Sequence, residues 1–144
     1  RRIVAAVHAG WRGTVNRILA KTLHRMQSAY GTEGTDIIAC IGPGISLDSF
    51  EVGDEVYEAF RTENFPMEYI SVWKPETHKY HIDLWAANRL QLSDFGVPPR
   101  QIENAGICTY RQHEDFFSAR RLGIKSGRIL SGIMLNRQEK EERK

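Results

Sequence analysis

Three residues near the start of the chain have side chains that can do chemistry and lie close together in sequence. His8, Trp11 and Arg12 offer a metal ligand or proton acceptor, a stacking surface and an anion-binding guanidinium. Gly10 lies between His8 and Trp11, and Gly13 follows Arg12. Glycine lets a backbone turn sharply and approach a ligand closely. The spacing predicts a site in a tight turn. A hydrogen-bonded core histidine and a core tryptophan are the structural alternative.

This turn joins a predicted strand to a predicted helix. Residues 3–7 form a short apolar run rich in β-branched side chains, which favours a buried strand. From Thr14, the expected N-cap, apolar side chains recur at the spacing of one helical face as far as Tyr30. Gly31 supplies the left-handed stop that commonly follows a helix. The site therefore lies at the end of a strand, where α/β proteins tend to gather their chemistry.

The rest of the chain alternates short apolar runs with amphipathic stretches. Strands are predicted at residues 37–41, 71–73, 80–82, 102–108 and 129–135, and helices at residues 54–60 and 84–95. Asp83 stands where it can cap the second helix, and the charged tail from residue 136 to 144 is expected to be frayed or helical. We therefore expect one α+β domain over residues 1–144, a layered sandwich of mixed sheets with helices outside.

Two later stretches have residues suited to binding a ligand. The glycine-rich turn at residues 42–44 ends at Gly44 and leaves backbone N–H groups for a ligand, although a purely structural turn is the commoner case. Phe117 offers a ring that can stack on a base. Arg120 and Arg121 offer guanidinium groups, which bind phosphate oxygens through paired hydrogen bonds. A surface ion pair is the alternative for each arginine.

Composition narrows the class of protein. The chain has 144 residues, of which 41% are hydrophobic and 26% charged, as in an ordinary globular protein. The net charge of +2 is too small to argue for nucleic acid or an acidic membrane surface. No stretch approaches the roughly 18 apolar residues of a membrane span. Cys40 and Cys108 are two free thiols that suit a reducing cytosol, and Cys40, within an apolar run, is expected to behave as a small, inert hydrophobic side chain.

Histidine usage limits the metal chemistry. The chain has five histidines and no His-X-His pair, whereas a multicopper enzyme needs many histidines besides a cysteine ligand. Zinc takes three or four ligands from histidine, cysteine and carboxylates, with one position open in a catalytic site. His8 is the one candidate at a predicted strand end. The histidine content therefore argues against multicopper chemistry, although it leaves a copper ion possible.

The sequence around His8 also resembles a known family. The block AAVHAGWRGT at residues 5–14 and five later blocks, in order, are similar to the laccase-domain or multicopper polyphenol oxidase family, whose members are described as purine nucleoside phosphorylases. The later blocks are residues 41–45, 50–53, 81–92, 106–109 and 116–121. The resemblance implies a zinc-dependent phosphorylase that converts adenosine or inosine and phosphate to the free base and ribose 1-phosphate, with adenosine deaminase side activity.

Within that resemblance the residues take expected roles. His8 is implied to be a zinc ligand, and we expect His8 and Arg12 to be catalytic. Substrate binding is assigned to Trp11, Gly44, Phe117, Arg120 and Arg121. The expected binding partners are the substrates, a purine nucleoside and phosphate. The sequence also allows a homodimer, in which the partner is a second copy of the chain.

One departure from the family qualifies these roles. Its members carry an upstream histidine ligand and a cysteine in an Ala-Asp-Cys motif, whereas this chain starts at Arg1, one predicted strand before His8. The sequence looks like the C-terminal part of such a protein, as a fragment, a truncated gene model or a true short form, so we expect weak activity or none.

Three alternatives stay open. The first is a cysteine-type amidase or peptidoglycan editing hydrolase on a fold grouped with a toxin deamidase, for which Cys40 would have to lie within reach of His8. The second is a copper polyphenol oxidase, and the third is a non-enzymatic α/β piece with an incomplete site.

Overall fold

A computed structural model describes residues 2–136, so the tail predicted from residue 136 to 144 lies almost entirely outside the described residues. The helices are α1 (Trp11–Val15), α2 (Ile18–Tyr30), α3 (Asp54–Thr62), α4 (Met67–Ile70), α5 (Leu84–Asp94) and α6 (Ala119–Leu122). The strands are β1 (Ala39–Ile41), β2 (Glu51–Val52), β3 (Ser71–Lys74), β4 (Lys79–Ile82) and β5 (Ile102–Asn104). Single 3-10 turns are η1 (Gly34–Asp36), η2 (Leu47–Ser49) and η3 (Pro99–Gln101).

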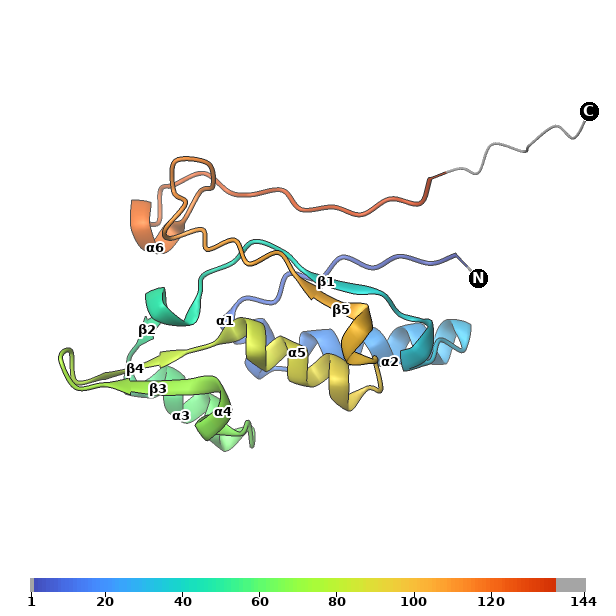
Figure 1. The fold of residues 1–144 in the computed structure, drawn as a ribbon, viewed down its shortest axis with the longest axis horizontal. Coiled ribbons are helices and arrows are strands. Elements are labelled where there is room, and N and C mark those ends of the chain that lie inside the picture. Colours follow the sequence, from blue (N-terminus) through green and yellow to red (C-terminus); the bar gives the residue numbers. More distant parts are fainter. Residues whose placement is uncertain (1, 137–144) are drawn as a thin grey trace, which may run out of the picture.

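The strands form two small sheets of different kinds. β1 and β5 pair in parallel, whereas β2, β4 and β3 form an antiparallel sheet in that order. Figure 1 shows the antiparallel sheet with α3 and α4 at one end of the molecule and α2 at the other, with α5 between them. The predicted α+β class is confirmed, with parallel and antiparallel pairing in separate sheets.

Helix α5 contributes to both hydrophobic cores. The first core lies between α3, the antiparallel sheet and α5, and it includes Phe60, Ile82 and Ala87, none of which is exposed. The second lies between α2, α5, β1 and β5, and it includes Leu23 and Leu92. Because an apolar side chain is stabilised by burial, a helix shared by two cores holds the two halves of the structure together.

The local helix and hairpin predictions are confirmed. The helix predicted at residues 54–60 is α3, and the strands predicted at residues 71–73 and 80–82 form the hairpin of β3 and β4. The carboxylate of Asp83 caps α5 by accepting a hydrogen bond from the Ala86 N–H at 2.9 Å. Strand β2 was not predicted, and β1 and β5 are shorter than the apolar runs that contain them.

The helix predicted to start at Thr14 is instead two helices. Thr14 is buried in α1, and its hydroxyl donates to the Ala9 carbonyl at 3.0 Å instead of capping a helix. The helix is interrupted at Arg17, which adopts a left-handed conformation with φ 54° before α2 begins. Gly31 ends α2 in the left-handed conformation, as predicted.

Two predicted strands are absent. Residues 3–7 and 129–135 have no regular secondary structure, because a strand exists only where a neighbour accepts and donates its backbone hydrogen bonds, and neither segment has such a neighbour within the described residues. None of the helices between residues 2 and 136 combines the length and hydropathy that crossing a bilayer requires.

Candidate functional site

The predicted turn around His8 is present and starts a helix. Gly10 is the N-cap of α1, with an extended backbone, and the His8 ring lies beside it. A Cβ atom at position 10 would lie 3.2 Å from Nε2 of His8, which is tighter than ordinary contact. Glycine at this position therefore lets the exposed imidazole fold over the turn.

Buried hydrogen bonds fix this turn to α5. The Thr14 hydroxyl donates to the Ala9 carbonyl, one residue after His8, and accepts a hydrogen bond from Nδ2 of Asn88 at 3.0 Å. Nδ2 of Asn88 also donates to the Leu84 carbonyl at 2.8 Å. Because Thr14 and Asn88 are both buried, these bonds are costly to leave unmade, and they set the position of the turn.

Trp11 and Arg12 interact with each other. The Arg12 guanidinium lies 4.3 Å from the centroid of the Trp11 ring, and Trp11 packs against the first core. In this arrangement Arg12 covers one face of the indole that was predicted to stack on a base.

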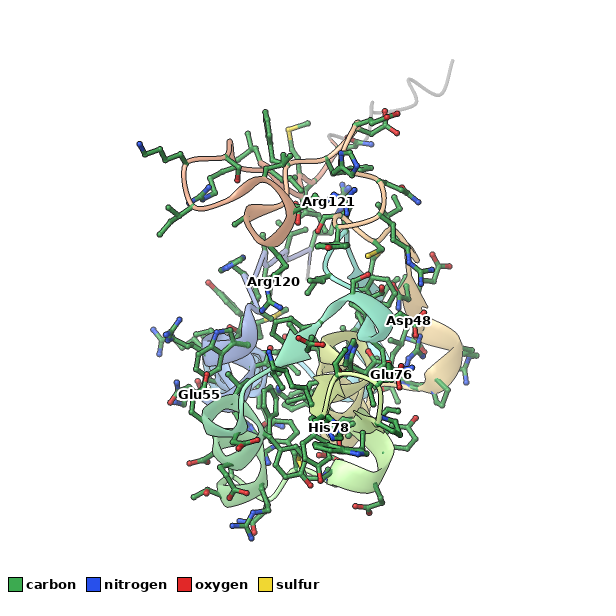
Figure 2. All side chains as sticks on the ribbon, turned by 90° about the vertical axis from the view of Figure 1, so that its left-hand side faces the viewer. Asp48, Glu55, Glu76, His78, Arg120 and Arg121 are labelled. Atoms are coloured by element: carbon green, nitrogen blue, oxygen red, sulfur yellow. The ribbon has the colours of Figure 1, made fainter. Side chains whose placement is uncertain are left out.

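A separate cavity of about 480 Å³ lies near η2, β2 and α6. Figure 2 shows Arg120 extending from α6 towards β2, with Asp48 on the neighbouring η2 turn. The cavity is lined by polar and charged side chains throughout, namely Asp48, Ser49, Glu51, His81, Tyr110, Arg111 and Arg120.

The charged groups of this cavity are held by specific partners. Nη1 of Arg120 donates to the Glu51 carbonyl at 2.6 Å, and Nη2 of Arg111 pairs with the Asp48 carboxylate at 2.9 Å. Hydrogen bonds from Thr77 and Lys79 lower the pKa of the Glu51 carboxyl, with Lys79 Nζ at 3.2 Å. Glu51 is therefore an ionised carboxylate at neutral pH.

His81 has a defined orientation at the floor of the cavity. Its side chain is buried, and Nδ1 lies 2.9 Å from the Leu47 carbonyl, so Nδ1 carries the proton and Nε2 faces Glu51 at 3.7 Å. In the neutral ring Nε2 is free to accept a hydrogen bond from a ligand.

Cys108 lies beside the cavity, next to Ser49. Burial raises the pKa of its thiol, but hydrogen bonds from the Ser46 hydroxyl and backbone N–H, the Arg111 backbone N–H and the Ser49 hydroxyl outweigh it and lower the pKa to about 7. The Ser46 hydroxyl lies 3.1 Å from Sγ. Cys108 is thus a thiol with strong thiolate character at neutral pH.

The structure separates the predicted site residues into two groups. Arg120 lines the cavity, whereas His8, Trp11 and Arg12 do not. Arg121 lies over the Tyr110 ring at 5.1 Å, and Phe117 is half exposed and contacts Gly127.

Gly44, predicted to bind substrate, lies in a turn whose backbone is hydrogen-bonded. Its N–H donates to the Ile107 carbonyl at 3.1 Å, so that N–H is not open to a ligand. Sequence reasoning missed the other residues that line the cavity, which come together only through long-range pairing, namely Asp48, Ser49, Glu51, His81, Tyr110 and Arg111.

The possible metal donors among the described residues do not form a common site. Between residues 2 and 136 no three histidine, cysteine or carboxylate side chains gather as they would to hold a metal ion. His8 by itself does not fit a zinc or copper site, which needs at least three protein ligands. Cys40 is exposed, and no hydrogen bond in the described residues joins it to His8. The cysteine amidase alternative has no support in this geometry.

Comparison with known proteins gives consistent matches. The family described as multi-copper polyphenol oxidoreductase laccase matches residues 1–136. A purine nucleoside phosphorylase of Bacteroides thetaiotaomicron is 64% identical over 134 residues, covering 93% of this chain and 50% of that protein. Adenosine deaminase RL5, from an unknown prokaryotic organism, is 51% identical over 131 residues, covering 91% of this chain and 50% of that protein.

Solved structures agree with the sequence matches. The crystal structure of YlmD from Geobacillus stearothermophilus has a TM-score of 0.70 and 34% identity, covering 80% of this chain and 43% of that one. The chain spans about half the length of the curated relatives it matches. These matches confirm the resemblance predicted from the blocks around His8.

Proposed function

The chain belongs to the multi-copper polyphenol oxidoreductase laccase family, and on that premise we propose that it takes part in the phosphorolysis of purine nucleosides. The relatives named purine nucleoside phosphorylase support this reaction, and the relative named adenosine deaminase supports deamination of adenosine as a side activity. The substrates would be adenosine or inosine and phosphate, and the products the free base and ribose 1-phosphate.

The observation that carries the proposal is the mixed charge of the cavity. Arg111 and Arg120 supply guanidinium groups, which suit the oxygens of a phosphate. Glu51 supplies an ionised carboxylate, which suits the hydroxyl groups of a sugar by accepting their hydrogen bonds. A sugar phosphate needs both kinds of group within one cavity, and about 480 Å³ is enough for a ligand of that size.

Individual residues take roles from this arrangement. Arg120 would hold the phosphate, because its Nη1 is fixed on the Glu51 carbonyl while its other nitrogens remain to bind oxygens. Nε2 of His81 would accept a hydrogen bond from a sugar hydroxyl. His8 does not line this cavity, so the catalytic role proposed for it, moving a proton with its exposed imidazole, rests on the resemblance to the family.

Zinc dependence is part of the proposal for a complete protein. His8 is the donor that this chain would contribute, and the other ligands would have to come from outside residues 2–136. No step of the reaction is assigned to the metal. We expect the chain in the cytoplasm, since its cysteines are free thiols and such thiols suit a reducing compartment.

Binding of phosphate and of ribose 1-phosphate, measured by isothermal titration calorimetry, tests the cavity directly. Arg120→Ala should weaken both ligands by about 10- to 100-fold, since a hydrogen bond to a charged group contributes about 1.5–3 kcal/mol. Glu51→Gln should weaken ribose 1-phosphate and leave phosphate binding unchanged.

Arg128→Ala is the matched control, because that arginine is exposed and hydrogen-bonds only to carbonyl and hydroxyl groups of its own loop among the described residues. Equal affinities in wild type, Arg120→Ala and Arg128→Ala would refute the assignment of this cavity.

A further inference from the structure

The antiparallel sheet presents two hydrogen-bond acceptors side by side in the cavity. Glu51 on β2 and His81 on β4 are direct partners in the register of the two strands, so their side chains stand on the same face of the sheet. The next pair, Val52 and Tyr80, stands on the opposite face and packs in the first core. Glu51 and His81 therefore both face the cavity, which they line.

The two acceptors lack a donor between them. Nε2 of His81 and Oε2 of Glu51 lie 3.7 Å apart, too far for a direct hydrogen bond. The His81 side chain is only 10% exposed, and Nδ1 is held by the Leu47 carbonyl, so Nε2 of the neutral ring is an acceptor. No hydrogen bond in the described residues occupies that atom. Because a buried acceptor is costly to leave unpaired, the two atoms suit a ligand that brings a donor for each.

The charge of this pair is already balanced, which favours neutral donors. Nζ of Lys79 lies 3.2 Å from Oε1 of Glu51, the carboxylate oxygen that does not face His81. Hydrogen bonds from Thr77 and Lys79 lower the pKa of the Glu51 carboxyl, so the ionised group accepts hydrogen bonds and donates none. Hydroxyl groups donate without adding charge, so two neighbouring hydroxyls suit this pair better than an ammonium group.

The group that would bind phosphate lies next to this pair. Nη1 of Arg120 donates to the backbone carbonyl of Glu51 at 2.6 Å, and Figure 2 shows this arginine extending from α6 towards β2. In α-ribose 1-phosphate the phosphate, the 2-hydroxyl and the 3-hydroxyl follow one another on one face of the sugar ring. A ribosyl group therefore brings an anion and two adjacent donors, which match Arg120 and the neighbouring acceptors.

We propose that Glu51 and His81 recognise the cis-diol of a ribosyl group and make the cavity selective for ribose over 2-deoxyribose. The selectivity rests on the proposed function, because that function places a phosphate at Arg120, and it narrows the substrates to ribonucleosides. The two hydroxyls would each donate to one acceptor, Nε2 of His81 or Oε2 of Glu51. A 2-deoxyribosyl ligand would leave one acceptor unpaired, which weakens binding.

Isothermal titration calorimetry of this chain with four probes tests the selectivity. The probes are inorganic phosphate, ribose 1-phosphate, 2-deoxyribose 1-phosphate and arabinofuranose 1-phosphate, whose 2-hydroxyl lies on the opposite face of the ring. Ribose 1-phosphate should bind about 10- to 100-fold more tightly than the other two sugar phosphates. Equal affinities for the three sugars would overturn the diol site, whereas phosphate binding lost in Arg120→Ala would still support the proposed function. No binding of any probe would overturn both.

Two variants remove the acceptors one at a time. In Glu51→Gln the amide oxygen should face Lys79, which can only donate, so the amide NH₂ replaces Oε2 and cannot accept a hydrogen bond. His81→Asn keeps a donor for the Leu47 carbonyl and removes Nε2. Each variant should reduce the preference for ribose 1-phosphate over 2-deoxyribose 1-phosphate to less than about 3-fold and leave phosphate affinity unchanged.

Matched controls lie in the turn between β3 and β4. Glu76→Gln and His78→Asn make the same substitutions at exposed residues that do not line the cavity, and asparagine tolerates the left-handed backbone of His78. Both should keep the wild-type preference. A wild-type preference in Glu51→Gln or His81→Asn would overturn the proposal. A parallel loss of phosphate affinity in those two variants would also overturn it, because it would show that they only support the cavity.

Discussion

Replacing Thr14 with valine tests how the turn that carries His8 is held. Valine keeps the shape of the side chain and removes the hydroxyl, which donates to the Ala9 carbonyl and accepts from Asn88, each at 3.0 Å. Thr14 is fully buried, so water cannot replace either partner. Asn88 keeps its second bond to the Leu84 carbonyl, so the variant should still fold.

The expected loss follows from these contacts. Two net hydrogen bonds contribute about 1–3 kcal/mol together, and leaving the partly buried Ala9 carbonyl unpaired adds about 1 kcal/mol. Thr14→Val should therefore lower the free energy of unfolding by about 2–4 kcal/mol. In urea denaturation followed by circular dichroism this is a midpoint about 1–2 M lower with an unchanged slope.

A control variant and a double-mutant cycle separate the loss of the Thr14 hydroxyl from other effects on stability. Thr22→Val removes a hydroxyl that bonds only within its own helix, to the Ile18 carbonyl, so it should change stability by less than about 0.5 kcal/mol. Thr14→Val and Asn88→Leu should show a coupling of about 0.5–3 kcal/mol in a double-mutant cycle. A Thr14→Val variant as stable as Thr22→Val, or strictly additive changes, would refute the reasoning.

Three further predictions concern other parts of the structure. The Cys108 thiolate should titrate near pH 7 by ultraviolet absorbance, and Ser46→Ala should raise that midpoint by removing a hydrogen bond to Sγ. Because the pKa is lowered in the folded state, the stability contributed by this thiolate is complete above its unfolded pKa and is lost as the pH falls through about 7. Asp83→Ala should lower the free energy of unfolding by about 1 kcal/mol through loss of the α5 cap. Gly34→Ala should cost about 1–3 kcal/mol, because a Cβ there would collide with the backbone of Gly96.

Each of these predictions has a control in the chain. Cys108→Ser should remove the titration near pH 7, and a step that persists would assign it to another group. Asp94→Ala, at the far end of α5, should not destabilise, since a carboxylate there opposes the helix dipole. Gly42→Ala should be neutral, as no atom lies within 4 Å of its added Cβ. Equal losses at Asp83 and Asp94, or at Gly34 and Gly42, would count against the corresponding mechanism.

Features determined by neighbouring residues could be predicted from the sequence. The Asp83 cap, the end of α2 at Gly31 and the hairpin of β3 and β4 depend on residues within a few positions of one another. The local sequence pattern was therefore sufficient to predict them. The break at Arg17 could not be predicted in this way. Its left-handed backbone is supported from far along the chain, where its guanidinium donates to the Glu63 carbonyl at 2.9 Å and lies over the Phe65 ring.

The strand pairing and the cavity also depend on residues far apart in the sequence, which a local pattern does not reveal. Residues 3–7 and 129–135 have strand-like composition, but composition does not supply a neighbour to pair with. Arg120, which lines the cavity, was predicted from the chemistry of its side chain and from the family block at residues 116–121. His81 and Arg111 were missed because pairing of β2 with β4, and of Gly44 with Cys108, brings them beside Arg120.

Product analysis tests the proposed reaction most directly. The chain, alone and joined to the half of the Bacteroides thetaiotaomicron phosphorylase that it does not match, would be incubated with zinc, phosphate and inosine or adenosine, and the products separated by chromatography. We predict free base and ribose 1-phosphate, formed only when phosphate is present and lost in His8→Ala and Arg120→Ala but retained in Arg128→Ala. Absence of phosphate-dependent product from the folded, joined protein, or equal turnover in all three variants, would contradict the proposed function.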